Sequence, residues 1–148
     1  MRNLTDNMPV AVATNSSIAL AKIAVASLGV QIPTAVTAEE AGYYKPHPRP
    51  YRMVLERLGC KAGHVLFVAG SPGDVHGASR VGFPVEWHNR MHLPATDSPG
   101  TPLIASGSLL PILDIVQAPH ASRTTRTITV PVETGKGRGG PQPNLHFG

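Results

Sequence analysis

Cysteine, aromatic residues and long apolar runs are scarce in this 148-residue chain, and each scarcity excludes something. The single cysteine, Cys60, cannot form an intramolecular disulfide, so a disulfide framework is excluded and a reducing, cytoplasmic compartment is favoured. No run of about 18 apolar residues occurs, so the sequence predicts no membrane-spanning helix. Aromatic residues make up only 5% of the chain, but hydrophobic residues make up 41%, which is enough for the core of one domain.

Most of the net positive charge lies at the C-terminal end of the chain. The formal net charge is +4, and residues 118–148 hold four cationic side chains against one acidic side chain, Glu133. This segment is also rich in Pro and Gly, which predicts a disordered tail. Because the basicity belongs to the tail, we expect no nucleic-acid partner. The predicted organisation is a lead over 1–8, a partial core domain over 9–117 and the tail over 118–148.

Apolar runs and helical patterns alternate along residues 9–116. The predicted strands are 9–14, 64–71, 84–88 and 101–106, and the predicted helices are 16–30, 49–59, 74–83 and 106–116. The strands are short apolar runs, which is typical of buried parallel strands, and the helices carry apolar residues at helical spacing. Alternating strands and helices predict right-handed crossovers and an α/β fold with a parallel sheet.

Polar residues follow the predicted strands at three places. Thr14 and Asn15 end the first strand, Lys45 precedes a proline-framed helix, and Asp74 follows the small residues that end the strand 64–71. The carboxyl ends of parallel strands are where ligands bind in open α/β sheets. Each residue alone also has an ordinary structural interpretation, because Ser and Thr cap helices and Asp stabilises helix N-termini. Taken together, they predict a site for a small anion.

Four stretches carry a resemblance to a known family. In order, "VAVATNSS", "TAEEAGYYKPHPRPY", "LFVAGSPGDVHGA" and "VEWHNR" resemble the later motifs of the haloacid dehalogenase-like hydrolases, closest to the 2-haloacid dehalogenase branch. The resemblance covers 9–116 and rests on order and spacing. It implies hydrolysis of a small 2-haloacid through an ester formed on a nucleophilic Asp.

The resemblance also implies roles for five residues. Thr14 and Asn15 match the hydroxyl motif that orients the nucleophile or holds the anionic substrate, and Lys45 matches the lysine that balances the carboxylates. Asp74 matches the last acidic residue, and Tyr51 matches the tyrosine near the site. Ser71, which we also expect to contact the substrate, departs from the dehalogenase pattern, because it stands where that pattern has an Asn. An ammonium near a carboxylate favours its ionised form, which is the form a nucleophilic Asp needs.

One part of the family pattern is absent from this sequence. No Asp followed by the expected Gly-Thr stretch comes after an apolar strand, so the nucleophile and most of a helical cap are missing. We therefore expect an incomplete three-layer, Rossmann-like fold that lacks its central strand, in a truncated chain that is inactive alone. The two halves then either close up, receive a strand from a second copy or a complementing N-terminal half, or fold poorly, since unpaired backbone groups line the gap.

The metal requirement separates two branches of the family. Ser71 stands where an acidic residue is frequent in the Mg²⁺-dependent phosphatases, and a hard cation needs several oxygen ligands. We therefore predict a cofactor-free dehalogenase type with no metal site. The alternatives are a Mg²⁺-dependent phosphatase of the same superfamily and a non-catalytic binding remnant.

Overall fold

The computed structural model describes residues 8–95 and 100–117. The tail over 118–148 and nearly all of the lead over 1–8 lie outside the described residues. The strands are β1 (Ala11–Thr14), β2 (Thr34–Thr37), β3 (Phe67–Ala69), β4 (Val85–His88) and β5 (Ile104–Ser106). The helices are α2 (Ile18–Ser27), α3 (Ala38–Ala41), α4 (Pro48–Leu58), η1 (Ala62–His64), α5 (Pro72–Val81) and α6 (Leu110–Gln117). No helix in this part of the chain is long and apolar enough to cross a membrane.

The strands form two separate parallel sheets. In the first, β1 pairs with β2, with Val12 opposite Ala35. In the second, the order is β3-β4-β5, with Val68 opposite Glu86 and Glu86 opposite Ile104. Within the described residues, β1 and β3 do not pair with each other, so the halves have not closed into one sheet. The incomplete α/β fold expected from the sequence is confirmed.

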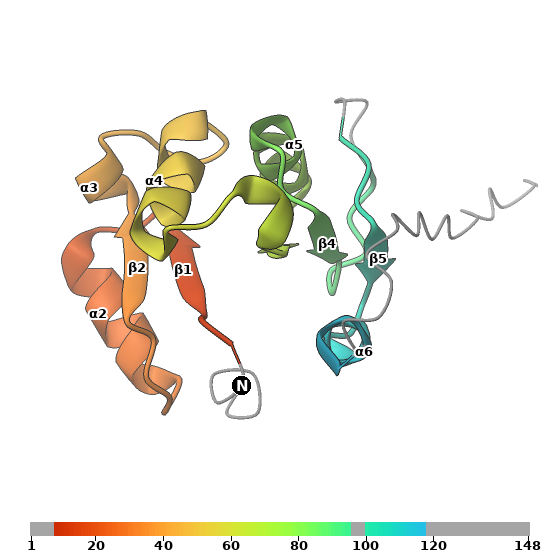
Figure 1. The fold of residues 1–148 in the computed structure, drawn as a ribbon, viewed down its shortest axis with the longest axis horizontal. Helices are drawn as coiled ribbons and strands as arrows, with labels where there is room; N and C mark the ends of the chain where they lie inside the picture. The colour runs from red at the N-terminus through yellow and green to blue at the C-terminus, as the bar shows by residue number, and fades with distance from the viewer. Residues whose placement is uncertain (1–7, 96–99, 118–148) are drawn as a thin grey trace, which may run out of the picture.

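The gap between β1 and β3 is called the break below. The chain builds the two sheets outward from this gap in opposite directions (Figure 1). The chain runs from β1 through α2 out to β2, whereas it runs from β3 through α5 out to β4 and β5. Right-handed crossovers therefore place α2 and α5 on opposite faces. The break between β1 and β3 is the point where the strand order reverses, which is the position of the ligand crevice in doubly wound folds.

The main core lies where α4 and α5 pack on β3 and β4. Its fully or nearly buried residues are Tyr51, Ala69, Val75, Ala78, Phe83, Val85 and Trp87. The ring of Phe67 packs edge-on against Tyr51, with centroids 5.3 Å apart, and against Phe83, with centroids 5.6 Å apart. The contact between Phe67 and Tyr51 joins α4 to the second sheet.

Local sequence accounts for the ends of the helices. His47 caps α4 by accepting a hydrogen bond from the Arg49 N–H, Pro48 occupies the first turn, and Gly59 ends the helix at φ 62°. At α3, Thr37 and Glu40 form a reciprocal capping box. Helix α5 begins at Pro72, two residues earlier than the sequence predicts, because Ser71 accepts a hydrogen bond from the Asp74 N–H as its cap.

Two sequence predictions about the strands need correction, and one strand was missed. The predicted strand over 64–71 is reduced to β3, because His64 ends a 3₁₀ turn and Gly70 and Ser71 form the bend that leads into α5. Strand β2, which pairs with β1, was not predicted at all. The run 9–14 was expected to be a buried strand, but all four residues of β1 are only half-buried. Their incomplete burial follows from pairing on one edge alone.

Candidate active site

Lys45 is held at the break by the side chain of Asn15. The Lys45 N–H donates to Asn15 Oδ1 at 2.7 Å, and Asn15 Nδ2 donates to the Lys45 carbonyl at 3.0 Å. Asn15 directly follows β1, so the first sheet fixes the backbone that carries the ammonium. The two prolines that follow Lys45, Pro46 and Pro48, restrict this backbone further because each fixes its own φ.

The Lys45 ammonium forms an ion pair with Asp74 of α5. Lys45 Nζ donates to Asp74 Oδ2 at 3.0 Å, and the two side chains are only 11% and 16% exposed. Lys45 Nζ also lies 5.9 Å from the centre of the Phe67 ring. Since Lys45 is tied to β1 through Asn15 and Asp74 follows β3, this ion pair links the two sheets at their carboxyl ends.

Tyr51 orients the second oxygen of Asp74. Its hydroxyl donates to Asp74 Oδ1 at 3.0 Å, and its side chain is completely buried. Burial raises the pKa of Tyr51 far above its ordinary value, and the negative charge of Asp74 raises it further. Tyr51 is therefore a permanent hydrogen-bond donor, and the carboxylate it holds faces Lys45.

A glycine makes room for this arrangement. A Cβ atom on Gly77 would lie 2.5 Å from the Tyr51 hydroxyl and 2.9 Å from Cβ of Pro46. Any side chain at position 77 would therefore displace either the tyrosine that holds Asp74 or the proline that follows Lys45. Gly77 therefore supports the site, a role that the sequence analysis did not assign to it.

The remaining predicted residues lie at the ends of the same two strands. Ser71 accepts from the Asp74 N–H at 3.2 Å, and so fixes the first turn of α5. Thr14 is half-buried and donates to Ser16 Oγ at 3.1 Å. At the N-terminus of α2, which follows these residues, the Ile18 N–H donates to Glu39 and the Leu20 N–H donates to Ser17.

The structure thus joins four of the six predicted residues into one network and places the other two beside it. The linked residues are Asn15, Lys45, Tyr51 and Asp74, and Ser71 bonds the backbone of Asp74. Thr14 lies beside the network because it directly precedes Asn15 in the chain. Sequence reasoning missed that Asn15 holds Lys45, because the two are 30 residues apart and no local pattern pairs them.

The donor set at the break does not suit a hard cation as it stands. Both oxygens of Asp74 already accept hydrogen bonds, from Lys45 and from Tyr51. Within 8–95 and 100–117, no group of three or more His, Cys, Asp or Glu side chains could hold a metal ion. A Mg²⁺ ion here would need further carboxylates and would have to compete with an ammonium for Asp74.

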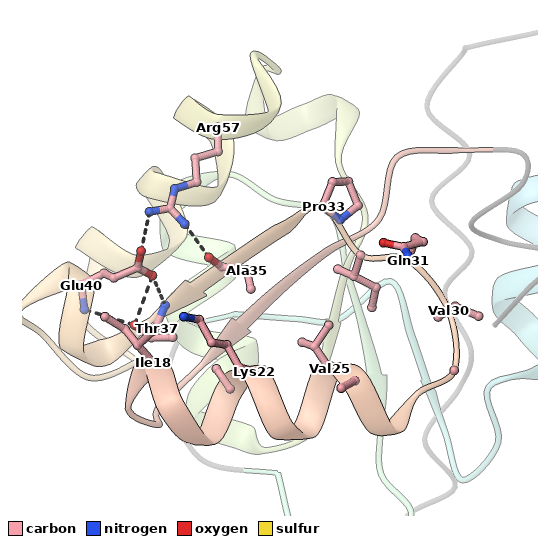
Figure 2. Close-up of a pocket in the computed structure, with 14 residues that line it drawn as sticks. Ile18, Lys22, Val25, Val30, Gln31, Pro33, Ala35, Thr37, Glu40 and Arg57 are labelled. Atoms are coloured by element: carbon pink, nitrogen blue, oxygen red, sulfur yellow. Dashed lines mark hydrogen bonds and ion pairs between the residues drawn. The ribbon is translucent and has the colours of Figure 1, made fainter.

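A groove on another side of the molecule is separate from this network. It lies between α2 and β2, has a volume of about 670 Å³ and is lined by apolar residues such as Ala21, Val25 and Ile32 (Figure 2). Figure 2 also shows Arg57 and Glu40 meeting at its rim beside β2. None of the six predicted site residues lines this groove.

Comparison with known proteins gives consistent matches. A family model described as haloacid dehalogenase-like hydrolase matches residues 1–82. Haloacetate dehalogenase H-2 of Moraxella sp. (strain B) is 40% identical over 55 residues, which are 37% of this chain and 25% of that protein. Phosphoglycolate phosphatase of Pectobacterium atrosepticum is 32% identical over 77 residues, which are 51% of this chain and 33% of that protein.

The solved structures give the same match at the level of the fold. The crystal structure of an L-2-haloacid dehalogenase superposes with a TM-score of 0.72 and 27% identity, over 79% of this chain and 53% of that one. This chain therefore spans about half the length of that structure and about a quarter of Moraxella haloacetate dehalogenase H-2.

Proposed function

Because this chain belongs to the haloacid dehalogenase-like hydrolase family, we propose that it forms the lysine-bearing half of a hydrolase site for small 2-haloacids. The observation that carries the proposal is the Lys45–Asp74 ion pair at the break between the two sheets. The proposed site is completed by a complementing segment, meaning a polypeptide that supplies a strand between β1 and β3 and a carboxylate at its end.

The position of Lys45 suits the first chemical step. An ionised carboxylate oxygen attacks the carbon that bears the halogen, the carbon–halogen bond breaks, and halide leaves with its bonding electrons. An ammonium beside the attacking carboxylate keeps that carboxylate ionised in a partly dry site. Asn15 holds the Lys45 backbone at both its N–H and its carbonyl, so the ammonium is placed before the substrate arrives.

The second step returns the carboxylate. Water attacks the carbonyl carbon of the ester, and cleavage of the bond between this carbon and the bridging oxygen releases a 2-hydroxy acid and restores the nucleophile. In this proposal Asp74 holds Lys45 and also takes the proton of the attacking water, because a carboxylate has lone pairs beyond the two that accept from Lys45 and Tyr51. Thr14 and Ser71 offer hydroxyl groups for the carboxylate of the small anionic substrate. Tyr51 is completely buried and positions Asp74 through its hydrogen bond.

The dehalogenase type is favoured over the phosphatase type by the bonding of Asp74. A carboxylate whose two oxygens are bound by Lys45 and Tyr51 serves a charge-balancing role without any cofactor. The phosphatase alternative draws on the match to phosphoglycolate phosphatase and would require Mg²⁺ held largely by carboxylates of the complementing segment. A binding remnant without activity is the third outcome of the experiment below.

The test is complementation with a defined segment. The N-terminal half of Moraxella haloacetate dehalogenase H-2 is co-expressed with this chain, the complex is purified, and halide release from chloroacetate and 2-chloropropionate is measured. We expect halide release that neither half gives alone. Lys45→Met should lower the rate by about 10²-fold or more, because a preorganised charge at the reacting group is removed, whereas Arg49→Ala, in an exposed ion pair on α4, should not.

Two results would contradict the dehalogenase proposal. Release of phosphate from p-nitrophenyl phosphate with Mg²⁺, without halide release, would assign the phosphatase type. A stable complex that releases neither halide nor phosphate, and that forms equally well with the Lys45→Met variant, would assign a binding remnant.

A further inference from the structure

The outer edge of β2 is a second place, besides the break, where an incoming strand can pair. Strand β2 pairs with β1 on one side only, and its other edge borders the open groove between α2 and β2. An exposed strand edge beside an apolar groove is a template for strand addition from another molecule. Any segment that adds there leaves the break between β1 and β3 unfilled.

Two charged side chains occupy the backbone groups of this edge. Arg57, in the last turn of α4, donates from Nη1 to the carbonyl of Ala35. Glu40, on α3, accepts from the Thr37 N–H through Oε2 at 3.2 Å. Successive residues of a strand direct their N–H and C=O groups to opposite edges, so Ala35 and Thr37 are the residues that face the outer edge while Val36 faces β1.

The same two side chains are bound to each other. Arg57 Nη2 lies 2.9 Å from Glu40 Oε1, and their side chains remain 37% and 30% exposed. Figure 2 shows the guanidinium reaching down from α4 to both Glu40 and Ala35 at the rim of the groove. A planar guanidinium can bond a carbonyl and a carboxylate at once, which a lysine ammonium does without a fixed fork.

The edges that face the break differ. Within 8–95 and 100–117, no side chain forms a hydrogen bond with the backbone of β1 or β3. The chain therefore blocks one edge and leaves open the two edges that the complementing segment must join. Helices α3 and α4 supply the two blocking residues, so the same helix that carries Tyr51 into the site also closes the competing edge.

We propose that Arg57 and Glu40 form an edge guard, which prevents strand addition at the outer edge of β2 and so keeps that edge from competing with the break between β1 and β3. This inference rests on the proposed function only for the identity of the strand that enters the break. The guard itself acts on any extended segment, including β2 of a second copy of this chain.

The test compares Arg57→Ala with Arg49→Ala in the full chain. Both substitutions remove an arginine and its ion pair with a glutamate from α4, but only Arg57 contacts β2. We expect Arg57→Ala to self-associate at concentrations at least several-fold lower than the unmodified chain in sedimentation velocity. Hydrogen exchange should then show new protection at residues 34–37, with 11–14 unchanged. Arg49→Ala should sediment as the unmodified chain does.

Two outcomes would overturn the edge guard. The first is that Arg57→Ala sediments as Arg49→Ala does at every concentration. The second is that association protects 11–14 and leaves 34–37 exposed. If Arg57→Ala loses its far-ultraviolet circular dichroism, Glu40→Gln replaces it, because the amide keeps an acceptor for Thr37 but loses the charge that fixes Arg57. Neither readout depends on catalysis, so failure of the guard is distinguishable from failure of the dehalogenase proposal.

Discussion

Glu86 is the residue whose position least fits its chemistry. It lies in the middle of β4 with no exposed surface, and neither of its carboxyl oxygens has a hydrogen-bond partner among the described residues. Its neighbours Val85 and Trp87 point into the main core, so Glu86 points to the opposite face of the sheet. Burial raises the pKa of the Glu86 carboxyl above its ordinary value.

This burial predicts a stabilising substitution. Because the folded-state pKa of Glu86 is raised, its contribution to stability is fully present below about pH 4.5 and is lost as pH rises through the folded pKa. Glu86→Gln removes the buried charge and should raise the free energy of unfolding at pH 7.5 by about 1–3 kcal/mol. Urea unfolding at pH 5 and pH 7.5 measures the change, which should be larger at the higher pH.

A matched control for Glu86→Gln is Glu56→Gln, because Glu56 lies on the surface in an exposed pair with Arg49. Its effect should stay within about 0.5 kcal/mol at both pH values. A Glu86→Gln variant that is destabilised, or whose effect does not change with pH, would show that the buried carboxyl has a compensating partner.

The residues of the candidate site were partly predictable at this scale. Strand-end reasoning found Lys45 and Asp74, because parallel sheets gather polar side chains at one end. It did not find that Asn15 holds the Lys45 backbone or that Arg57 binds Ala35, since both contacts join residues more than 20 positions apart. A single sequence carries no pattern that reports such pairs.

Among the elements, α5 depends on the close approach of α4. The two helices pack together, and Gly77 of α5 lies against Tyr51 of α4. In an exposed helix interior, Gly→Ala stabilises by roughly 0.5–1 kcal/mol, because glycine loses more backbone entropy on folding. At Gly77 this gain is opposed by the absence of space.

Gly77→Ala should therefore destabilise the chain, by about 1–3 kcal/mol, because overpacking displaces Tyr51 and its hydrogen bond to Asp74. Gly73→Ala is the control within the same helix, since the nearest atom to its added Cβ is Ser71 Oγ at 4.0 Å. Thermal unfolding of both variants decides the prediction, and equal midpoints would contradict it.

Most helices were predictable as elements, whereas strand β2 was not. Residues such as Ser17, Pro48 and Gly59 mark the ends of the helices in the sequence. Strand β2 runs without a turn into α3, so no loop signal marks its end, and it pairs with β1 along its whole length. Short strands depend on such non-local pairing, which local sequence does not reveal.

For the whole molecule, α2 presents an apolar surface that the described chain leaves uncovered. It packs through Ala21 and Val25, yet Leu20 is 60% exposed and Ile23 is 68% exposed. Lys22 is its one charged residue. A helix that is apolar on all sides is typical of a buried helix, so we expect the complementing segment to cover this face.

Ile23→Lys should separate the isolated chain from the complex. In the isolated chain the change should alter the free energy of unfolding by no more than about 0.5 kcal/mol, because the side chain is already in water. It should weaken binding of the complementing segment at least tenfold, since burial of an Ile is worth about 1.5–3 kcal/mol. Titration calorimetry measures both variants, with Lys61→Ala as an exposed control outside α2.

At this scale the sequence predicted the break in the sheet but left open how the halves respond to it. They keep their own sheets and are joined by the Lys45–Asp74 pair and by the packing of α4 on both. Which response prevails depends on the sum of many weak contacts across the break, and no motif encodes that sum.

The two open edges also impose a polarity. The carboxyl ends of β1 and β3 both lead to the Lys45 network, through Asn15 on one side and Asp74 on the other. One inserted strand can be parallel to both edges only if it enters amino end first at the far rim and finishes beside the ammonium. A peptide with the reversed sequence would bring its acidic residue to the opposite end of the break when it pairs in parallel. The break therefore selects a strand by its direction as well as by its side chains.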